Sequence, residues 1–159
     1  MVKEGESATS FKLPSTAGGE RSLQDYRGQK LVIFFYPKDE TPGCTREACA
    51  FRDNFDVIRE AGAQVIGVSK DSIRSHEKFL SNHDLPFELL SDPDNGVSSA
   101  YGAYGEKKMY GRTVMGTIRS TCLIDEIGKV EKIWSPVRVD GHVEKVVEAL
   151  GATPRTTQA

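Results

Sequence analysis

The sequence predicts a three-layer α/β sandwich, in which a mixed central sheet carries helices on both faces. Two continuous apolar runs, Leu31–Tyr36 and Ala63–Ser69, are typical of strands covered on both sides. Helical periodicity fills the segments between and after these runs, which favours parallel pairing at the start of the sheet. Two later strands, Ser120–Ile124 and Val130–Trp134, are joined by a short segment containing Gly128, which favours an antiparallel hairpin.

The first elements are a hairpin and a long helix. Phe11–Leu23 predicts two short strands that turn at Gly18 and Gly19, a pair suited to a tight turn. After the first apolar strand, apolar side chains recur at helical spacing, which predicts one continuous helix ending near Gly62. The apolar stripe of this helix consists of Cys44, Ala48, Phe51, Phe55 and Ile58.

Three further helices are expected at Ser72–Asn82, Gly96–Tyr101 and Gly141–Leu150, the last with valines along one side. No repeat, low-complexity segment or linker divides the sequence. We therefore expect one domain over residues 1–151 of the 159. The polar segment 152–159 follows the last helix and is expected to be disordered.

Charge and hydropathy argue against two classes of partner. The chain has 21 Lys and Arg against 23 Asp and Glu, a net charge of −2, so no basic excess is present to neutralise nucleic-acid phosphates. The longest apolar run, Leu31–Tyr36, is far shorter than the ~20 residues that a membrane-spanning helix needs. Residues 1–10 contain Lys3, Glu4 and Glu6 and lack the apolar run of a secretion signal. We therefore expect a cytoplasmic protein in a reducing environment.

Three cysteines, Cys44, Cys49 and Cys122, indicate redox chemistry. Their odd number leaves at least one thiol unpaired, and in a reducing compartment a pair is more often catalytic, redox-sensing or metal-binding than structural. No C-x-x-C spacing is present, and the histidines form no zinc pattern with the cysteines, so no metal site is expected. Cys122 alternates with apolar residues in a strand and is expected to be a small buried side chain. His76 and His83, in a predicted helix, are expected to be solvated.

The segment Tyr36–Cys49, with the sequence YPKDETPGCTREAC, carries the candidate chemistry. Thr41 followed by Pro42 is a helix-start signal, with threonine at the N-cap and proline at the first helical position. Cys44 is then the third helical residue, the position at which a capping box places a carboxylate. The unpaired N–H groups and partial positive charge of a first turn favour a thiolate there. Gly43 leaves the sulfur unshielded, and the Thr41 hydroxyl can donate to the sulfur or to a substrate oxygen.

We therefore predict that Cys44 is an activated nucleophile, because thiols at helix N-termini ionise more readily than a free cysteine. The alternative is a buried cysteine that only heads the apolar stripe. Cys49 lies five residues further on, and on an intact helix the two Cα atoms are about 8.6 Å apart, beyond the ~7 Å that a disulfide tolerates. Either the two cysteines never pair, with Cys49 a small residue beside the stripe, or pairing requires the helix start to unwind.

Arg119 directly precedes the apolar strand Ser120–Ile124, where a charged side chain needs a partner. A thiolate is one candidate, and a guanidinium beside it would stabilise the ionised sulfur and polarise a substrate oxygen. The alternative is an arginine at the rim of the sheet that pairs with a carboxylate. Nothing in the spacing places Arg119 beside Cys44.

The pattern Pro37-x-x-x-Thr41-x-x-Cys44 resembles the active-site signature of the peroxiredoxins. The spacing from Cys44 to Cys49 is similar to that of the subgroup called bacterioferritin comigratory protein or peroxiredoxin Q. The likeness extends over residues 3–150 and includes Phe34–Pro37, Gly67–Asp71, Ser91-Asp92, Met109–Gly111 and Gly116–Asp125. The resemblance implies a thioredoxin-like fold and a thiol-dependent peroxidase that uses no cofactor.

The resemblance also implies residue roles. Cys44 matches the peroxidatic cysteine, which attacks hydrogen peroxide or an organic hydroperoxide and becomes a sulfenic acid. Cys49 matches the resolving cysteine of members that carry both cysteines in one helix, with thioredoxin, or else glutaredoxin, as the reductant. Thr41 and Arg119 match residues that orient the peroxide and stabilise the leaving oxygen, and Pro37 matches the proline that shields the pocket. A resolving cysteine in the same chain removes the need for a second subunit, which favours a monomer.

Two other functions remain open. One is a thiol–disulfide oxidoreductase on the same fold, which the lack of a C-x-x-C motif disfavours. The other is a peroxide-sensing redox switch, in which pairing of Cys44 with Cys49 changes the conformation and signals to a partner.

Overall fold

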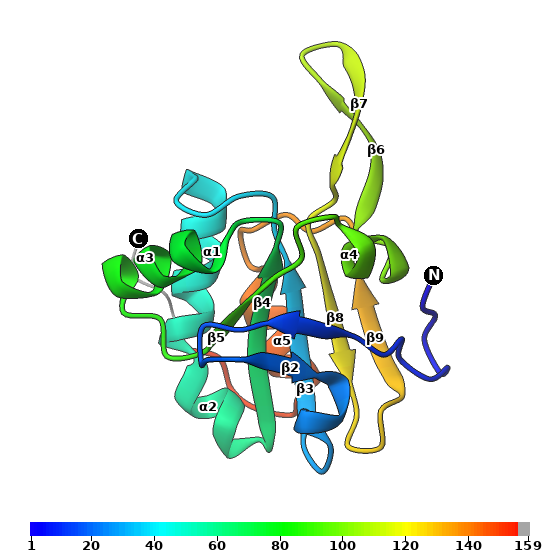
Figure 1. Cartoon of the computed structure of the whole chain (residues 1–159). Coiled ribbons are helices and arrows are strands. Elements are labelled where there is room, and N and C mark those ends of the chain that lie inside the picture. Colours follow the sequence, from blue (N-terminus) through cyan, green and yellow to red (C-terminus); the bar gives the residue numbers. More distant parts are fainter. Residues whose placement is uncertain (156–159) are drawn as a thin grey trace.

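A computed structural model describes residues 1–155, which form nine strands, five α-helices and one 3₁₀ helix (Figure 1). The strands are β1 (Lys12–Pro14), β2 (Glu20–Ser22), β3 (Lys30–Phe35), β4 (Ala63–Ser69), β5 (Glu88–Ser91), β6 (Tyr104–Met109), β7 (Arg112–Thr117), β8 (Ser120–Ile124) and β9 (Val130–Trp134). The helices are η1 (Leu23–Tyr26), α1 (Pro42–Asp53), α2 (Phe55–Glu60), α3 (Ile73–His83), α4 (Gly96–Ala100) and α5 (His142–Ala149).

Five strands form the central sheet in the order β5-β4-β3-β8-β9. On one side of β3, the strands β4 and β5 follow in parallel, and on the other side β8 and β9 follow in antiparallel pairs. The predicted mixed sheet is therefore confirmed, and β4, β8 and β9 have the bounds expected from the sequence. The connection from β3 through α1 and α2 to β4 places the start of α1 at one end of the central strand (Figure 1).

Alternate side chains of β3 point to two apolar layers, one on each face of the sheet. Val32 and Phe34 face a cluster with residues of α1, α2 and α5, among them Phe51. Leu31 and Ile33 face a second cluster with residues of the β1–β2 hairpin, η1 and the α4 region. Helices therefore cover both faces of the sheet, as the three-layer prediction required (Figure 1).

Two sequence-based expectations about helices are wrong. The single helix predicted over the stripe from Cys44 to Ile58 is two helices, α1 and α2, which meet at Asn54. The buried Asn54 side chain donates from Nδ2 to the Ala50 carbonyl at 2.9 Å, and α2 restarts with the apolar stripe in phase. His76, expected to be solvated, is completely buried because it lies on the inner face of α3, three residues before Phe79.

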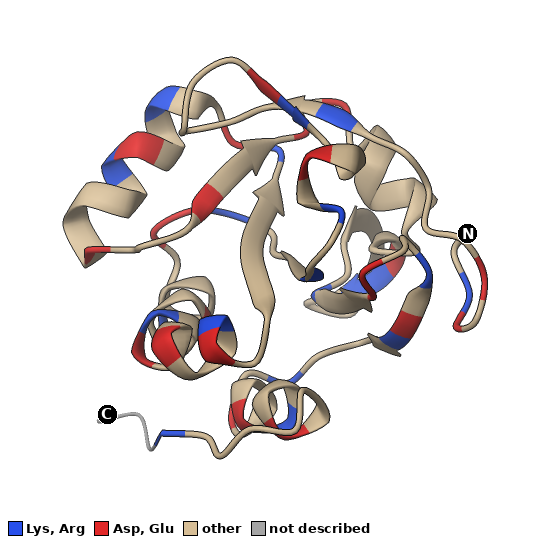
Figure 2. Cartoon of the chain, turned by 90° about the horizontal axis from the view of Figure 1, so that it is seen from below, with Lys and Arg blue, Asp and Glu red and all other residues tan. Residues whose placement is uncertain are grey.

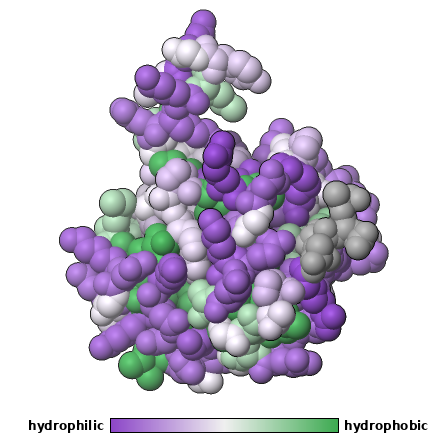
Figure 3. Space-filling view, turned by 180° about the vertical axis from the view of Figure 1, so that it is seen from behind, coloured by the Kyte–Doolittle hydropathy of each residue, from purple (hydrophilic) through white to green (hydrophobic). Residues whose placement is uncertain are grey.

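The hairpin of β6 and β7 projects from the body of the molecule (Figures 1 and 3). The sequence pattern does not predict these two strands, because both faces of the hairpin are solvated and its residues do not alternate between apolar and polar. Its last residue, Thr117, is buried and stands two positions before Arg119, so the hairpin leads directly into the candidate active site.

The surface shows no large region of one charge sign in the view of Figure 2. Basic and acidic residues are intermixed over the elements visible there, as the near-neutral net charge of the sequence suggests. Among residues 1–155, no helix combines the length and apolar character that crossing a bilayer demands.

After α5 the chain returns to α2, where the Arg155 backbone N–H donates to Asn54 Oδ1 at 2.6 Å and the Arg155 guanidinium binds Asp56. Of the tail expected over 152–159, residues 152–155 therefore adjoin α2, and 156–159 lie outside the described residues.

Candidate active site

The start of α1 has the predicted geometry. Thr41 is the N-cap, with extended backbone angles (φ −79°, ψ 151°), and Pro42 is the first helical residue. The Thr45 N–H donates to the Thr41 carbonyl at 2.9 Å, which closes the first helical turn. Cys44 lies within that turn, and only 1% of its surface is exposed. Its sulfur is therefore held at a helix end whose N–H groups and dipole favour negative charge, in surroundings from which most water is excluded.

Arg119 contacts Cys44 although the two residues are 75 positions apart in the sequence. Its Nη2 donates to Cys44 Sγ at 3.5 Å, within the range of a hydrogen bond to sulfur. Gly43 permits this approach, because a Cβ atom at that position would lie 3.2 Å from the same nitrogen. Glycine at position 43 therefore makes room for the guanidinium, while Cys44 itself is buried rather than unshielded as expected from the sequence.

Glu47 is a site residue that was not predicted from the sequence. Its Oε1 accepts a hydrogen bond from Arg119 Nη1 at 2.8 Å, and its side chain is completely buried. Its Oε2 has no hydrogen-bond partner within residues 1–155. Burial raises the pKa of Glu47 to about 7, although Arg119 opposes the shift. The sequence does offer one signal for Glu47, its spacing from Cys44. Glu47 lies three residues after Cys44, and side chains at positions i and i+3 share one face of a helix.

Arg119 has two ionisable partners, Glu47 and Cys44. Burial lowers the pKa of Arg119, but Glu47 and Cys44 outweigh it, and the net pKa is raised. The guanidinium therefore keeps its charge while it is turned toward the sulfur on one side and held by a carboxyl group on the other. Both interpretations of Arg119 from the sequence apply together: it has a carboxylate partner, and it lies beside Cys44.

The Thr41 hydroxyl is placed differently from the expectation that it donates to the sulfur. Oγ1 donates to the Lys38 carbonyl at 2.8 Å. Its O–H is thereby engaged as a donor, and its oxygen retains the capacity to accept a hydrogen bond from a substrate O–H. Pro37 is half-buried in the loop that joins β3 to Thr41, so it belongs to the same end of the sheet.

The other two cysteines do not touch Cys44, and all three are free thiols. Cys49 is half-buried on α1, which is helical through both positions, so the two Cα atoms are about 8.6 Å apart. Burial raises the pKa of Cys49, opposed by Arg52 and reinforced by Asp53, which favours the neutral thiol. Cys122 is a buried side chain in the cluster on the opposite face of the sheet, as predicted, and burial raises its pKa to about 12.

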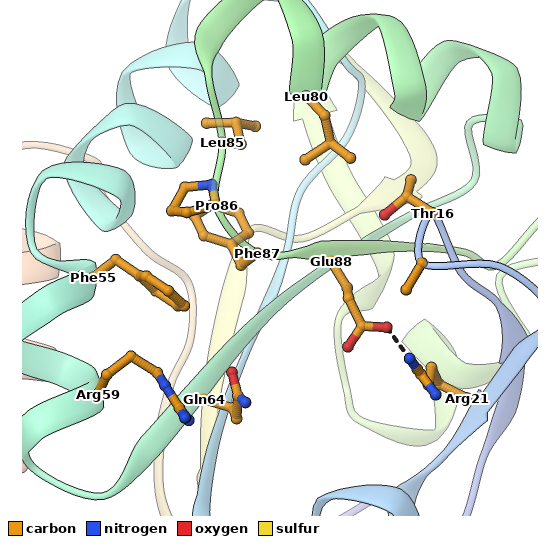
Figure 4. A pocket seen from close by; sticks show the side chains of 11 residues that line it. Thr16, Arg21, Phe55, Arg59, Gln64, Leu80, Leu85, Pro86, Phe87 and Glu88 are labelled. Atoms are coloured by element: carbon orange, nitrogen blue, oxygen red, sulfur yellow. Dashed lines mark hydrogen bonds and ion pairs between the residues drawn. The ribbon is translucent and has the colours of Figure 1, made fainter.

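A cavity of about 500 Å³ opens elsewhere, between α2, α3 and β5 (Figure 4). Phe55 and Phe87 form its apolar wall, and Arg21 pairs with Glu88 on its other side. None of the five residues predicted for the active site lines it. The chemistry around Cys44, rather than cavity size, therefore identifies the candidate site.

The geometry joins a nucleophile to a fixed cation. A sulfur at a helix start can attack an electrophilic atom, and a guanidinium 3.5 Å away can stabilise negative charge on the departing atom. The arrangement suits a small substrate with a weak bond between two electronegative atoms.

Comparison with known proteins gives the same family. Residues 5–133 match the model of the AhpC/TSA family. A protein of Coxiella burnetii named as a Bcp peroxiredoxin is 46% identical over 149 residues, which cover 94% of this chain and 99% of the relative. Peroxiredoxin Bcp of Bacillus subtilis is 42% identical over 149 residues, with coverages of 94% and 95%.

Solved structures agree in fold and in family. Peroxiredoxin Q of Xanthomonas campestris superposes with a TM-score of 0.84 at 40% identity and covers 89% of each chain. The same organism's bacterioferritin comigratory protein, studied for its alkyl peroxide reduction activity, gives a TM-score of 0.84 at 40% identity, with coverages of 89% and 90%. On the strength of these sequence and structure relationships, the chain belongs to the AhpC/TSA family, in its Bcp/PrxQ subfamily of peroxiredoxins, which are thiol peroxidases.

Proposed function

We propose that the protein reduces hydrogen peroxide and organic hydroperoxides at Cys44. The observation that carries this proposal is the contact of Arg119 Nη2 with Cys44 Sγ, at 3.5 Å, at the start of α1. A peroxide has the weak bond between two electronegative atoms that this site suits. The alkyl peroxide reduction activity studied for the Xanthomonas campestris relative supports organic hydroperoxides as a second substrate class.

In the first step the Cys44 thiolate attacks one peroxide oxygen and the O–O bond breaks. The sulfur loses two electrons and becomes a sulfenic acid, and the other oxygen leaves as water or an alcohol after it takes up a proton. Arg119 and the N–H groups of the first turn stabilise the charge that develops on the leaving oxygen. Thr41 Oγ1 accepts a hydrogen bond from the peroxide while its own O–H donates to the Lys38 carbonyl, and Pro37 limits access of water.

In the second step Cys49 resolves the sulfenic acid. Its thiol sulfur bonds to Cys44 Sγ, the sulfenic oxygen leaves as water, and an intramolecular disulfide remains. Because α1 in its helical form keeps the two Cα atoms about 8.6 Å apart, the start of the helix must unwind first. Glu47 Oε2 in the second turn has no hydrogen-bond partner within residues 1–155, and this favours the opening, because unwinding hydrates a buried polar atom.

In the third step an external dithiol restores both thiols by exchange and is itself oxidised to a disulfide. Thioredoxin is the reductant we propose, with glutaredoxin as the alternative. The resolving cysteine lies in the same chain, so the cycle needs one subunit, and we propose a monomer. Three free cysteines suit the reducing cytoplasm.

Peroxide consumption by the purified protein, with thioredoxin, its reductase and NADPH, tests the proposal. Cys44→Ser should abolish turnover, and Cys49→Ser should consume one equivalent of peroxide and then stall. Cys122→Ser is the matched control and should cycle normally, since Cys122 lies on the other side of the sheet. Turnover by Cys44→Ser would refute Cys44 as the residue that reduces the peroxide, and a wild-type protein that oxidises once without recycling would favour the redox switch. Reduction of protein disulfides without peroxide consumption would favour the oxidoreductase.

A further inference from the structure

A buried carboxylate lies inside the segment that carries the site signature. Asp39, between Pro37 and Thr41, has a side chain that is only 2% exposed. Its Oδ1 accepts a hydrogen bond from Tyr36 Oη at 2.6 Å, and its Oδ2 accepts one from Ser75 Oγ at 2.8 Å. The proposed reaction uses none of these groups, so the burial of this carboxylate needs another explanation.

His76 on α3 completes the arrangement. Its Nδ1 lies 2.7 Å from Asp39 Oδ2, and its Nε2 lies 3.0 Å from the Leu90 carbonyl oxygen. A carbonyl oxygen only accepts, so Nε2 carries a hydrogen, and Nδ1 and Oδ2 share a second hydrogen between them. The imidazole is therefore fixed at both ends, with β5 behind it and the signature segment in front.

Asp39, Asp71 and His76 bring ligand-type atoms within 4.8 Å of one another, as in a metal site. Protein donors already occupy these atoms, because Asp71 Oδ2 accepts from Ser69 Oγ at 2.6 Å and from the Asp39 backbone N–H at 2.8 Å. The cluster therefore fastens three chain segments to one another. They are the loop after β3, the loop after β4 and the first turns of α3.

The fastened loop is the one that presents the reactive helix. Lys38, next to Asp39, supplies the carbonyl that receives the Thr41 hydroxyl at 2.8 Å, and Thr41 is the N-cap of α1. A displacement of Asp39 therefore moves the acceptor that orients Thr41 and the first turn that holds Cys44. Misplacement of reacting groups by about 1 Å can cost a hundredfold in rate.

We propose that Asp39 and His76 form a positioning pair, through which α3 holds the Pro37–Thr41 loop and keeps the Cys44 pocket formed. This proposal rests on the proposed peroxidase function. It adds His76, a residue outside the signature, to the residues on which the peroxidase reaction depends. It also confines unwinding of α1 to residues after Thr41, because the segment before Thr41 stays fastened. Cys44 then returns to the same pocket after each reduction.

Two substitutions of one residue separate positioning from stability. In His76→Asn the amide nitrogen occupies the place of Nδ1 and keeps the bond to Asp39, but the Leu90 bond is lost. In His76→Gln the longer amide reaches the Leu90 carbonyl, but the bond to Asp39 is lost. Each variant loses one buried hydrogen bond, so both should unfold at lower urea concentration than the wild type.

The measurement that separates a positioning role from a purely stabilising role is the second-order rate constant of Cys44 oxidation by hydrogen peroxide. It is measured by rapid quench and corrected for the folded fraction. His76→Gln should be slower than the wild type by about tenfold or more, and His76→Asn should stay within about threefold. Glu77→Gln is the neighbouring control, since Glu77 is the exposed residue next to His76 on α3 and should not change the rate constant.

Equal rate constants for both His76 variants, whether slowed or unchanged, would overturn the positioning pair. A variant that does not fold is replaced by Ser75→Ala, which removes a single donor to Asp39 and should slow oxidation, whereas Glu77→Gln should not. An unchanged rate constant for Ser75→Ala would then overturn the positioning pair. Failure of the proposed function gives a different result, because the wild-type protein itself would then consume no peroxide.

Discussion

Glu47→Gln is the substitution whose effect can be worked out most fully from the structure. The Glu47 carboxyl is completely buried beside Arg119, one of its oxygens has no partner within residues 1–155, and burial raises its pKa from 4.5 to about 7. The folded protein therefore holds this proton more tightly than the unfolded chain does. Its stabilising effect is fully present below about pH 4.5 and is lost as the pH rises through about 7.

The size of the effect follows from the pKa difference. A rise from 4.5 to about 7 is worth on the order of 3 kcal/mol of unfolding free energy. Glutamine does not titrate, yet its oxygen can still accept from Arg119, so any fixed loss from the substitution is the same at every pH. The unfolding free energy of Glu47→Gln minus that of the wild type should therefore rise by up to about 3 kcal/mol between pH 4.5 and pH 8.

Urea unfolding of the reduced proteins, followed by circular dichroism at several pH values, measures this difference. The exposed Glu148→Gln on α5 is the control and should run parallel to the wild type at every pH. Parallel curves for Glu47→Gln and the wild type would show that Glu47 titrates alike in the folded and unfolded states. A difference that falls with rising pH would mean that the Arg119 pair outweighs burial, and either result would refute the reasoning.

Two further substitutions test the parts around the sulfur. Arg119→Lys should lower kcat/KM for peroxide by about a hundredfold, because one ammonium cannot replace the fork that binds Glu47 and Cys44 together. Steady-state kinetics within twofold of the wild type would contradict that role. Asn54→Ala should cost about 1–3 kcal/mol of unfolding free energy, because the Arg155 N–H loses its acceptor and the Ala50 carbonyl keeps only the backbone N–H of residue 54 as a donor. An unchanged urea midpoint would show that Asn54 does not fasten the junction of α1 and α2.

The elements with strong periodicity were predictable from the sequence, and those governed by tertiary contacts were not. The apolar runs became β3 and β4 because burial on both faces leaves a clear signal. The break at Asn54 was hidden, because α2 resumes the stripe in phase after one capping residue. The β6–β7 hairpin was missed because two solvated faces remove the alternation on which strand prediction relies.

The candidate site was predictable to the extent that its chemistry is local. The start of α1 contains Thr41, Pro42 and Cys44 within four residues of one another. Helix-capping rules were therefore enough to predict their arrangement. The partner of Arg119 was open because the sequence does not state which strand end meets which helix end. His76 was misjudged because a polar side chain on the inner face of a helix is buried when the fold supplies its partners, here Asp39 and Leu90.

Peptide mapping after oxidation tests the central claim most directly. Trypsin cleaves after Lys38, Arg46 and Arg52, so Cys44 lies in peptide 39–46 and Cys49 in peptide 47–52, whereas Cys122 lies in peptide 120–129. After one equivalent of hydrogen peroxide, non-reducing mass spectrometry should find 39–46 joined to 47–52 by a disulfide, with 120–129 as a free thiol. Peptides 39–46 and 47–52 recovered unlinked, or 120–129 in the disulfide, would contradict resolution by Cys49.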